Sequence, residues 1–272
     1  MTQDLQNHIW KESKGSADWV IITVPDEHLY HPDFVNYLHQ AKRKGVTAIP
    51  GLGYEMLAKK FPAHDTHLAT AIRHGMVWEN YSKLSLFDPN SIEETNFGPG
   101  RHKSQPTGIV RYPHRAELLI LHFKWLGCDY VCQRSKLLRQ GLGAVDRKQN
   151  WGYEYDFSEA EIRRRMKDML AASINVLALG DRHHEIHLAR RWWRKKQDYQ
   201  LLKGPDLVSP RLAFAYGNTW RETRLRLPKV WVCFPAPLST LLCYGPQMLS
   251  SPSVIAAGPR DFANLLGCFV DG

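Results

Sequence analysis

The apolar positions near the start of the chain predict a strand, a helix and a second strand in succession. Residues 19–24 form an almost continuous apolar run, which is typical of a strand buried on both faces. Pro32 and Asp33 favour the first turn of a helix that stops at Gly45, and a second apolar strand follows at residues 46–50. This order predicts a right-handed crossover between parallel strands, with ligands at the carboxyl ends of the strands.

The pattern becomes irregular between residues 51 and 115, where glycine, proline and aromatic residues interrupt it. We expect a helix near residues 65–74 and otherwise a long loop, densest at residues 96–108. Irregular segments of this length inside a compact domain are usually functional. Strand character returns at residues 117–126, and a helix is expected at residues 129–140.

The final part of the chain begins with a predicted helix, and its apolar positions then show no regular spacing. Ser158 and Glu161 form a capping box that opens a helix to about Val176. Residues 182–203 carry seven basic residues against two acidic ones, which predicts a basic helix that adheres to anionic surfaces. We therefore expect a mixed α/β unit, a basic helical segment and an irregular, poorly packed tail, at residues 1–178, 179–204 and 205–272.

Composition adds a preference for anionic partners, because the formal net charge is +9 and the pI is near 9.3. The first residues are polar, so we expect no signal peptide or membrane anchor at the start. Residues 230–258 carry no charge, but four prolines interrupt them and argue against a membrane span. Five cysteines form no paired framework, which suits a reducing compartment. We expect a cytoplasmic protein, with peripheral binding at the inner membrane face as an option.

Asp26 and Glu27 follow the first predicted strand, at the end where a ligand would bind. Adjacent carboxylates at such a place suit Mg²⁺ or Mn²⁺, which prefers carboxylate oxygens and bridges to substrate phosphates. They also suit the start of a helix, where acidic residues cap backbone N–H groups. Spacing alone leaves both interpretations open.

Four segments of the chain resemble a group of bacterial glycosyltransferases related to family 2, which have the GT-A fold: WVIITVPDEHLYHP, GVTAIPGLGYEM, FDPNSIEETNFGPGRH and LLILHFKWLG. The resemblance covers about residues 7–176. It implies that a sugar is transferred from a nucleotide-sugar donor to a saccharide or lipid-linked acceptor, with Mn²⁺ or Mg²⁺ as cofactor. It also implies that Asp26 and Glu27 match the second Asp and the Glu of an Asp-x-Asp-Glu segment that holds the metal on the diphosphate. The first Asp of that segment falls on Val24 here, so one ligand is absent.

The same resemblance implies a nucleotide-binding unit of strands and helices ahead of residue 7. We therefore expect this chain to represent the C-terminal part of a GT-A-like mixed sheet flanked by helices. The alternative to an active transferase is an inactive remnant or an accessory binding domain without turnover.

Catalytic and phosphate-binding candidates come from the same segments. Glu27 and Glu55 are the candidate catalytic carboxylates, and Glu55 follows the second strand, where an acceptor hydroxyl would be deprotonated. Arg101 and His102 lie in a Gly-Pro-Gly loop that either presents them to a phosphate or is a structural turn.

His122 lies in an apolar strand and is either a core histidine or, by the resemblance, a third metal ligand. We expect it to approach Asp26 across the sheet, with the Gly-Pro-Gly loop facing the same crevice. Tyr54 and Lys83 complete the expected substrate-binding residues.

Two further spacings carry weaker signals. His183 and His187 are four apart, as zinc ligands on a helix can be, but the order His-Glu-Ile-His differs from the metalloprotease motif. The flanking arginines favour a solvated basic helix instead. Cys128 and Cys132 are expected to be buried thiols. A nucleic-acid or anionic-membrane binder that uses residues 182–203 is a third hypothesis, and we recognise no nucleic-acid motif that would support the first of these two partners.

Overall fold

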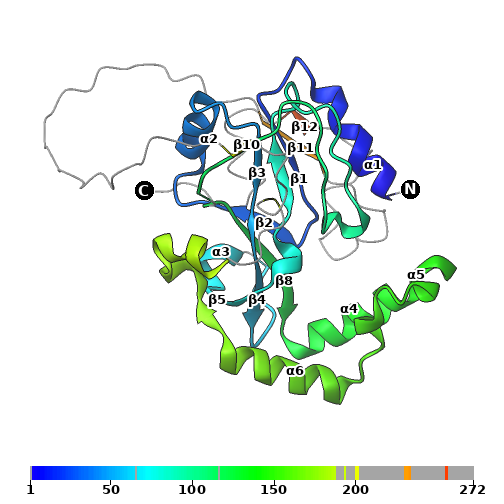
Figure 1. Cartoon of the computed structure of the whole chain (residues 1–272). Coiled ribbons are helices and arrows are strands. Elements are labelled where there is room, and N and C mark those ends of the chain that lie inside the picture. Colours follow the sequence, from blue (N-terminus) through cyan, green and yellow to red (C-terminus); the bar gives the residue numbers. More distant parts are fainter. Residues whose placement is uncertain are drawn as a thin grey trace, which may run out of the picture.

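The computed structural model describes residues 2–64, 66–115, 117–187, 193, 200–201, 230–233 and 255–256. These residues form a mixed α/β fold with two five-stranded sheets and helices around them (Figure 1). The predicted mixed α/β class is therefore confirmed.

Helices and strands are interspersed along the described chain. The helices are α1 (Thr2–His8), α2 (Phe34–Arg43), α3 (Leu68–Ala71), α4 (Cys128–Gln140), α5 (Ala144–Lys148), α6 (Glu159–Ala172) and α7 (His183–Ile186). The strands are β1 (Trp19–Ile22), β2 (Glu27–Tyr30), β3 (Ala48–Pro50), β4 (Leu52–Ala58), β5 (His74–Val77), β6 (Leu84–Phe87), β7 (Arg111–Tyr112), β8 (Leu119–Leu126), β9 (Ile174–Asn175), β10 (Gln200–Leu201), β11 (Val230–Cys233) and β12 (Ile255–Ala256).

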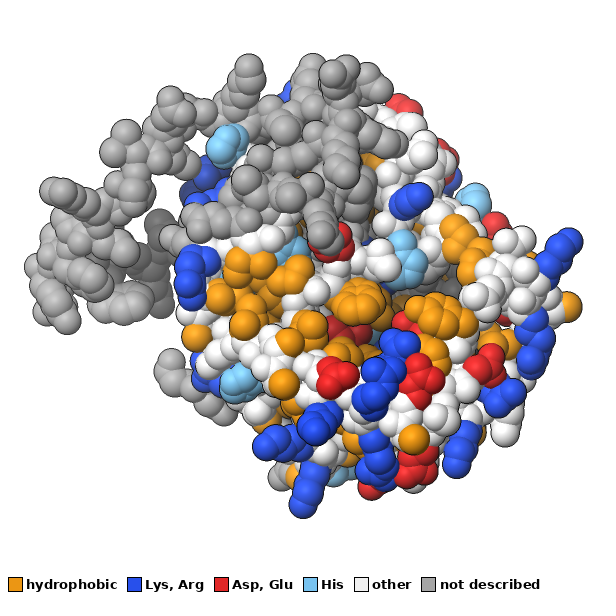
Figure 2. All heavy atoms as spheres, turned by 60° about the horizontal axis from the view of Figure 1, so that its bottom comes forward, with side chains coloured by type: hydrophobic (Ala, Val, Ile, Leu, Met, Phe, Trp, Pro, Cys, Tyr) orange, Lys and Arg blue, Asp and Glu red, His pale blue; other side chains and the backbone are white. Residues whose placement is uncertain are grey.

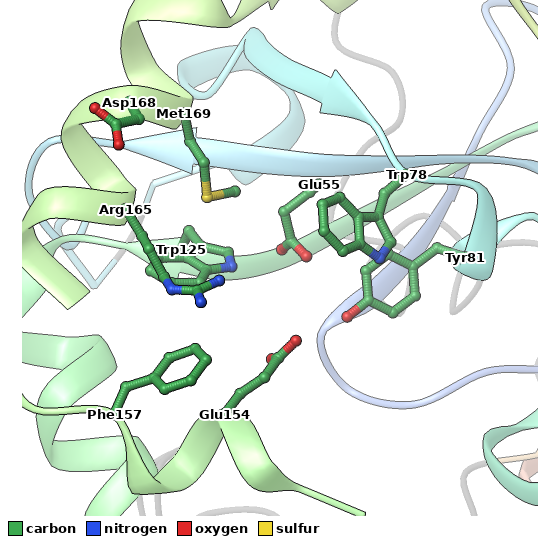
Figure 3. Close-up of a pocket in the computed structure, with 9 residues that line it drawn as sticks. All are labelled: Glu55, Trp78, Tyr81, Trp125, Glu154, Phe157, Arg165, Asp168 and Met169. Atoms are coloured by element: carbon green, nitrogen blue, oxygen red, sulfur yellow. The ribbon is translucent and has the colours of Figure 1, made fainter. Parts of the chain in front are cut away.

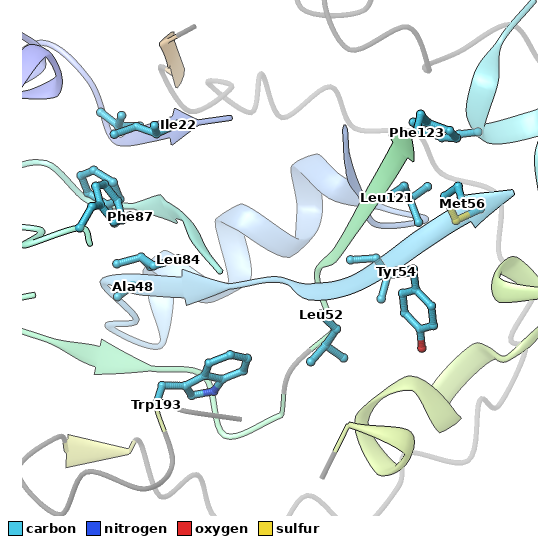
Figure 4. Close-up of a cluster of buried hydrophobic side chains, with 14 of the residues drawn as sticks. Ile22, Ala48, Leu52, Tyr54, Met56, Leu84, Phe87, Leu121, Phe123 and Trp193 are labelled. Carbon is cyan, nitrogen blue, oxygen red and sulfur yellow. The ribbon is translucent and has the colours of Figure 1, made fainter. Parts of the chain in front are cut away.

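The first sheet has the strand order β12-β11-β1-β6-β3. The two strands predicted on either side of the first helix, β1 and β3, both belong to this sheet. Strands β1 and β3 are both antiparallel to β6, so they run parallel to each other with β6 between them. Side chains of β1 alternate between two core clusters, as a strand buried on both faces requires. Trp19 and Ile21 pack with residues of α2, whereas Val20 and Ile22 join the main core, which contains residues of both sheets (Figure 4).

The second sheet has the order β2-β8-β4-β5-β9, and β8 lies between an antiparallel β2 and a parallel β4. The chain passes from β3 in the first sheet to β4 in the second through Gly51. A Cβ atom at Gly51 would lie 2.5 Å from the Ile120 side chain, so only glycine allows β8 to pack this closely against the connection.

The long loop predicted for residues 51–115 is wrong for its first half, because β4, β5 and β6 occupy residues 52–87. Its glycines are sites of close packing rather than breaks. A Cβ atom at Gly53 would lie 2.3 Å from the Tyr81 carbonyl carbon, and one at Gly75 would lie 2.7 Å from the Glu55 carbonyl oxygen. The structure is irregular mainly at residues 88–110, as predicted.

The two longer helices after β8 confirm their predictions closely. Helix α4 ends at Gln140, before Gly141, and α6 is capped by Ser158, whose Oγ accepts from the Glu161 backbone N–H at 3.2 Å. Helix α6 ends at Ala172, short of the predicted end. The two helices share a small core with Trp125 of β8.

Most of the predicted basic helix and irregular tail lies outside the described residues. Within them, α7 is short, and Trp193 is 1% exposed in the main core, so its ring is unavailable to a membrane surface (Figure 4). Two short segments of the tail form strands of the first sheet. Strand β11 runs parallel beside β1, and β12 pairs with β11. The described helices include none with the length and apolar character needed to cross a bilayer.

Replacing Gly53 by Ala should destabilise the fold, because the new methyl group would collide with the Tyr81–Ser82 backbone. We expect the free energy of unfolding to fall by about 1–3 kcal/mol, measured by urea denaturation. Gly98→Ala is the matched control, since its nearest neighbour would lie 3.7 Å from the new Cβ atom and its φ is −77°. Equal stability losses for the two variants would contradict the close packing at Gly53.

Candidate functional site

Three ionisable side chains form one row across three strands of the second sheet. Glu27 on β2 pairs with His122 on β8, and His122 pairs with Glu55 on β4. Residues directly opposite one another in neighbouring strands project from the same face of a sheet. The topology therefore brings together two candidate carboxylates and the candidate histidine.

His122 lies between two carboxylates and is 5% exposed. Its Nδ1 is 3.0 Å from Glu55 Oε1, its Nε2 is 3.4 Å from Asp26 Oδ2, and the Tyr81 ring stacks on it at 3.9 Å. Burial opposes the charged form of His122, but Glu55 and Asp26 outweigh it and raise the pKa to about 9. At neutral pH both ring nitrogens carry protons and face carboxylates. The expected approach of His122 to Asp26 is confirmed.

Glu27 is 3% exposed and is held by two cations. Lys83 Nζ donates to Glu27 Oε1 at 2.5 Å, and Arg101 Nη2 donates to Oε2. Burial favours the neutral acid, but the nearby Arg101 and Lys83 charges lower the pKa of Glu27 below its usual value. Glu27 is thus an ionised, internal counter-ion. It also begins strand β2, although the sequence predicted a loop at this position.

Arg101 is positioned by an unusual backbone. Its φ is +57°, directly after Gly100 at +61°, in a region that residues with a Cβ atom rarely occupy. Its guanidinium is 1% exposed and donates to the Ile22 carbonyl at 2.7 Å and to Ser85 Oγ at 3.2 Å, in addition to Glu27. These bonds offset a backbone strain of about 1–3 kcal/mol.

Asp26 completes the cluster at its more accessible side. Arg134 Nη2 donates to Asp26 Oδ2 at 2.5 Å. Burial would raise the pKa of Asp26, but His122 and Arg134 together hold it well below its usual range. The Nη1 atom of Arg134 is buried and has no hydrogen-bond partner among the described residues.

The charges of this cluster nearly balance. Three carboxylates form ion pairs with four cations, so the formal net charge of the cluster is +1. The carboxylates are those of Asp26, Glu27 and Glu55, and the cations are Lys83, Arg101, His122 and Arg134. Buried ion networks of this kind are costly to break, because removing one partner leaves another charge unpaired. We call these seven residues the ion cluster.

The side chains assigned to a metal do not fit a divalent cation in this arrangement. Both oxygens of Glu27 accept from cations, Asp26 Oδ2 accepts from Arg134, and His122 has a carboxylate at each nitrogen. A metal needs deprotonated nitrogen and unshared carboxylate oxygens. The described residues also contain no group of three or more His, Cys, Asp or Glu side chains placed to hold a metal ion. The metal role of Asp26, Glu27 and His122 stays a prediction.

His102 lies at the edge of the ion cluster, whereas Tyr54 lies apart from it. His102 is exposed, its Nδ1 is 2.6 Å from the Asn80 carbonyl oxygen, and its ring is 6.2 Å from the Tyr81 ring that stacks on His122. Tyr54 is on β4 next to Glu55, so it projects from the opposite face of the sheet. Its hydroxyl is 2.8 Å from His183 Nδ1. The structure therefore does not bring Tyr54 to the other candidates.

The solvated helix predicted for the two spaced histidines is wrong for these residues. The rings of His183 and His187 both contact Tyr54, and His187 is 3% exposed. Burial lowers the pKa of His183 to about 4. Among the thiols, Cys132 is buried as predicted and Cys128 is half-buried, with its Sγ 3.2 Å from Met166 Sδ.

A cavity of about 170 Å³ opens beside the ion cluster (Figure 3). Aromatic rings and charged groups share its wall, and Glu55 and Glu154 point into it from opposite sides. Figure 2 shows hydrophobic and acidic side chains side by side near the centre of this face. The cavity is lined by Glu55, Trp78, Tyr81, Trp125, Glu154, Phe157, Arg165, Asp168 and Met169.

Two of these residues connect the cavity to the ion cluster. Glu55 belongs to both, and Tyr81 lines the cavity while stacking on His122. Sequence reasoning found Glu55 but missed Trp78, Trp125 and Glu154. In the sequence these residues belong to no short motif. They share only the presence of aromatic residues near carboxylates.

Comparison of the chain with protein-family models, with curated proteins and with solved structures finds no match.

The raised pKa of His122 should make the fold sensitive to alkaline pH. The charge stabilises the folded state fully below pH 6.5, the ordinary pKa of histidine, and this contribution is lost as pH rises through about 9. We expect a loss of up to about 3 kcal/mol across that interval, measured by urea denaturation at several pH values. His122→Gln should lose this pH dependence, and exposed His64→Gln should keep it. A His122→Gln profile parallel to that of the wild type would contradict the assignment.

Titration with Mn²⁺ tests whether the ion pairs keep the candidate metal ligands from binding a metal ion. We expect the wild type to bind Mn²⁺ weakly, because Asp26 is already paired with Arg134. Arg134→Ala should bind Mn²⁺ more tightly than the wild type by calorimetry, since it releases Asp26. Arg139→Ala is the matched control, as it lies on the same helix and pairs with Asp156 instead. Micromolar binding by the wild type that Asp26→Asn abolishes would show that the ion pairs give way to metal.

Proposed function

We propose that the cavity binds a saccharide and that the chain belongs to a glycosyl-transfer system, as the sequence resemblance implies. The observation that carries this proposal is that each cavity carboxylate is paired with a cation. Glu55 contacts His122, Glu154 contacts Lys124, and Asp168 Oδ2 is 3.8 Å from Arg164. A cavity with compensated charges favours a neutral polar ligand over an ion.

Aromatic rings supply the second argument for a saccharide. Trp78, Tyr81 and Trp125 present flat apolar faces, which suit the C–H faces of a sugar ring, while the carboxylates accept hydrogen bonds from its hydroxyl groups. The cavity is smaller than the roughly 300–1,000 Å³ that hold drug-sized ligands. A single sugar ring of a larger acceptor is the matching size.

Glu55 is the proposed general base for the acceptor hydroxyl. Its carboxylate lines the cavity and is oriented by His122 at 3.0 Å, so its direction is fixed. The partly exposed side chain of Arg134, next to Asp26, is the proposed donor to the departing diphosphate.

A saccharide-binding domain without turnover is the second candidate. Both carboxylate oxygens of Glu27 are paired with Lys83 and Arg101, so Glu27 serves as a structural counter-ion, and this favours the binding domain. Binding and turnover must therefore be measured separately.

Binding is tested by ligand-observed NMR with glucose, galactose, mannose and N-acetylglucosamine. We expect at least one sugar to bind, and Trp78→Ala to weaken that binding about tenfold through loss of its stacking face. Trp151→Ala is the matched control, because Trp151 is similarly exposed, at 46% against 40%, and lies outside the cavity. Absence of binding for all four sugars, or equal loss in both variants, would refute the saccharide proposal.

Turnover is tested by incubating the binding sugar with UDP-glucose or GDP-mannose and following release of the nucleoside diphosphate. Glu55→Gln should keep sugar binding within about threefold but lose about 10²–10⁴ in kcat, the usual contribution of a general base. Sugar binding by the wild type without nucleotide release would favour the binding domain over the transferase.

A further inference from the structure

A helical arm projects from the body of the molecule (Figure 1). It consists of the end of α4, helix α5 and the start of the 3₁₀ turn η4 (Tyr153–Asp156), and we define it as residues 136–153. Nearly all its side chains are exposed or half-buried. The arm is the part of the described chain with the densest exposure of large apolar groups.

Four large apolar side chains of the arm face solvent. Leu137 is 59% exposed, Val145 64%, Trp151 46% and Tyr153 51%. Apolar residues scattered singly on a surface need no explanation, whereas four of them in one short segment are a candidate for an interaction site. Tryptophan and tyrosine are also the residues that prefer the interface between water and lipid.

The arm is strongly basic as well as apolar. Residues 136–153 contain four cations and the single carboxylate of Asp146, which gives them a net charge of +3, and Asp156 just beyond them pairs with Arg139. The four cations are Lys136, Arg139, Arg147 and Lys148. All four cationic side chains are exposed. This combination suits a negatively charged surface with an apolar interior.

The arm is an ordered hairpin, so its apolar groups are displayed by the fold. Arg139 Nε bonds Asp156 Oδ1 at 2.8 Å and thereby joins α4 to η4. The Trp151 backbone N–H donates to the Asp146 carbonyl at 2.8 Å. A Cβ atom at Gly152 would lie 3.0 Å from Leu142, which shows that Leu142 fills the inside of the hairpin.

We propose that the arm docks on the surface of an anionic lipid bilayer, with its cations at the headgroups and its apolar side chains inserted among them. Charge decides against a second copy of this chain as the occupant, because two arms would bring charges of +3 together. This inference is independent of the proposed function. It concerns a different segment from the basic residues 182–203.

Docking would place the cavity near the bilayer. Glu154 and Phe157 follow the arm directly in the chain and line the cavity. If the cavity holds a saccharide, a lipid-linked one would reach it from the membrane surface.

Vesicle flotation of the full chain is the test. We expect binding to phosphatidylcholine vesicles that contain phosphatidylglycerol, falling steeply with added salt, and little binding to phosphatidylcholine alone. Arg147→Glu/Lys148→Glu should reduce binding at least about tenfold, because each basic residue contributes to attraction by the anionic surface. Leu137→Ser/Trp151→Ser should also reduce binding, since it removes the inserted groups.

The matched controls alter equivalent residues elsewhere. Lys42→Glu/Arg43→Glu reverses two adjacent cations in the last turn of α2, as Arg147 and Lys148 lie in the last turn of α5. Ile109→Ser removes an apolar side chain that is 57% exposed. Unchanged binding in both controls supports the arm. Equal binding to neutral vesicles, or wild-type binding by both arm variants, would overturn the proposal, and so would self-association in gel filtration that Leu137→Ser/Trp151→Ser abolishes.

Discussion

The buried pairing of Glu27 with Arg101 and Lys83 is the constraint on which the rest of the structure depends. Arg101 bonds Glu27 of the second sheet and also the Ile22 carbonyl and Ser85 of the first sheet, so one guanidinium joins the two sheets. Removing one partner of a buried ion pair typically costs about 3–5 kcal/mol, because the remaining charge is left without compensation. The strained backbone at Arg101 is tolerated because the guanidinium must reach this place.

The ion cluster and the cavity are parts of one arrangement. Glu27 fixes the end of β2, the register of β2 on β8 places His122, and the register of β8 on β4 places Glu55 at the cavity wall. Each step is a backbone pairing, which is more rigid than a contact between loop side chains. A carboxylate that must accept a proton from a ligand benefits from such support, because its direction is set before the ligand arrives.

Local signals predicted the elements that local interactions determine. The apolar run of β1 and the Ser158 cap of α6 were read correctly because each signal lies within a few residues. Strand β2 was missed because it begins with a carboxylate whose burial depends on partners 56 and 74 positions away. The bond from Arg134 to Asp26 spans 108 positions and has no sequence signature. The approach of His122 to Asp26 was predictable only through the resemblance.

The cavity lies between the second sheet and the segment that returns from the arm, so its two facing carboxylates come from different elements. Glu55 stands on the sheet, whereas Glu154 belongs to the segment that returns from the arm and is tied to the sheet by Lys124. Because Lys124 lies on β8, next to the strand that carries Glu55, its ion pair with Glu154 fixes both cavity carboxylates relative to the same sheet. A ligand that contacts both carboxylates would therefore meet groups whose positions are set before it arrives.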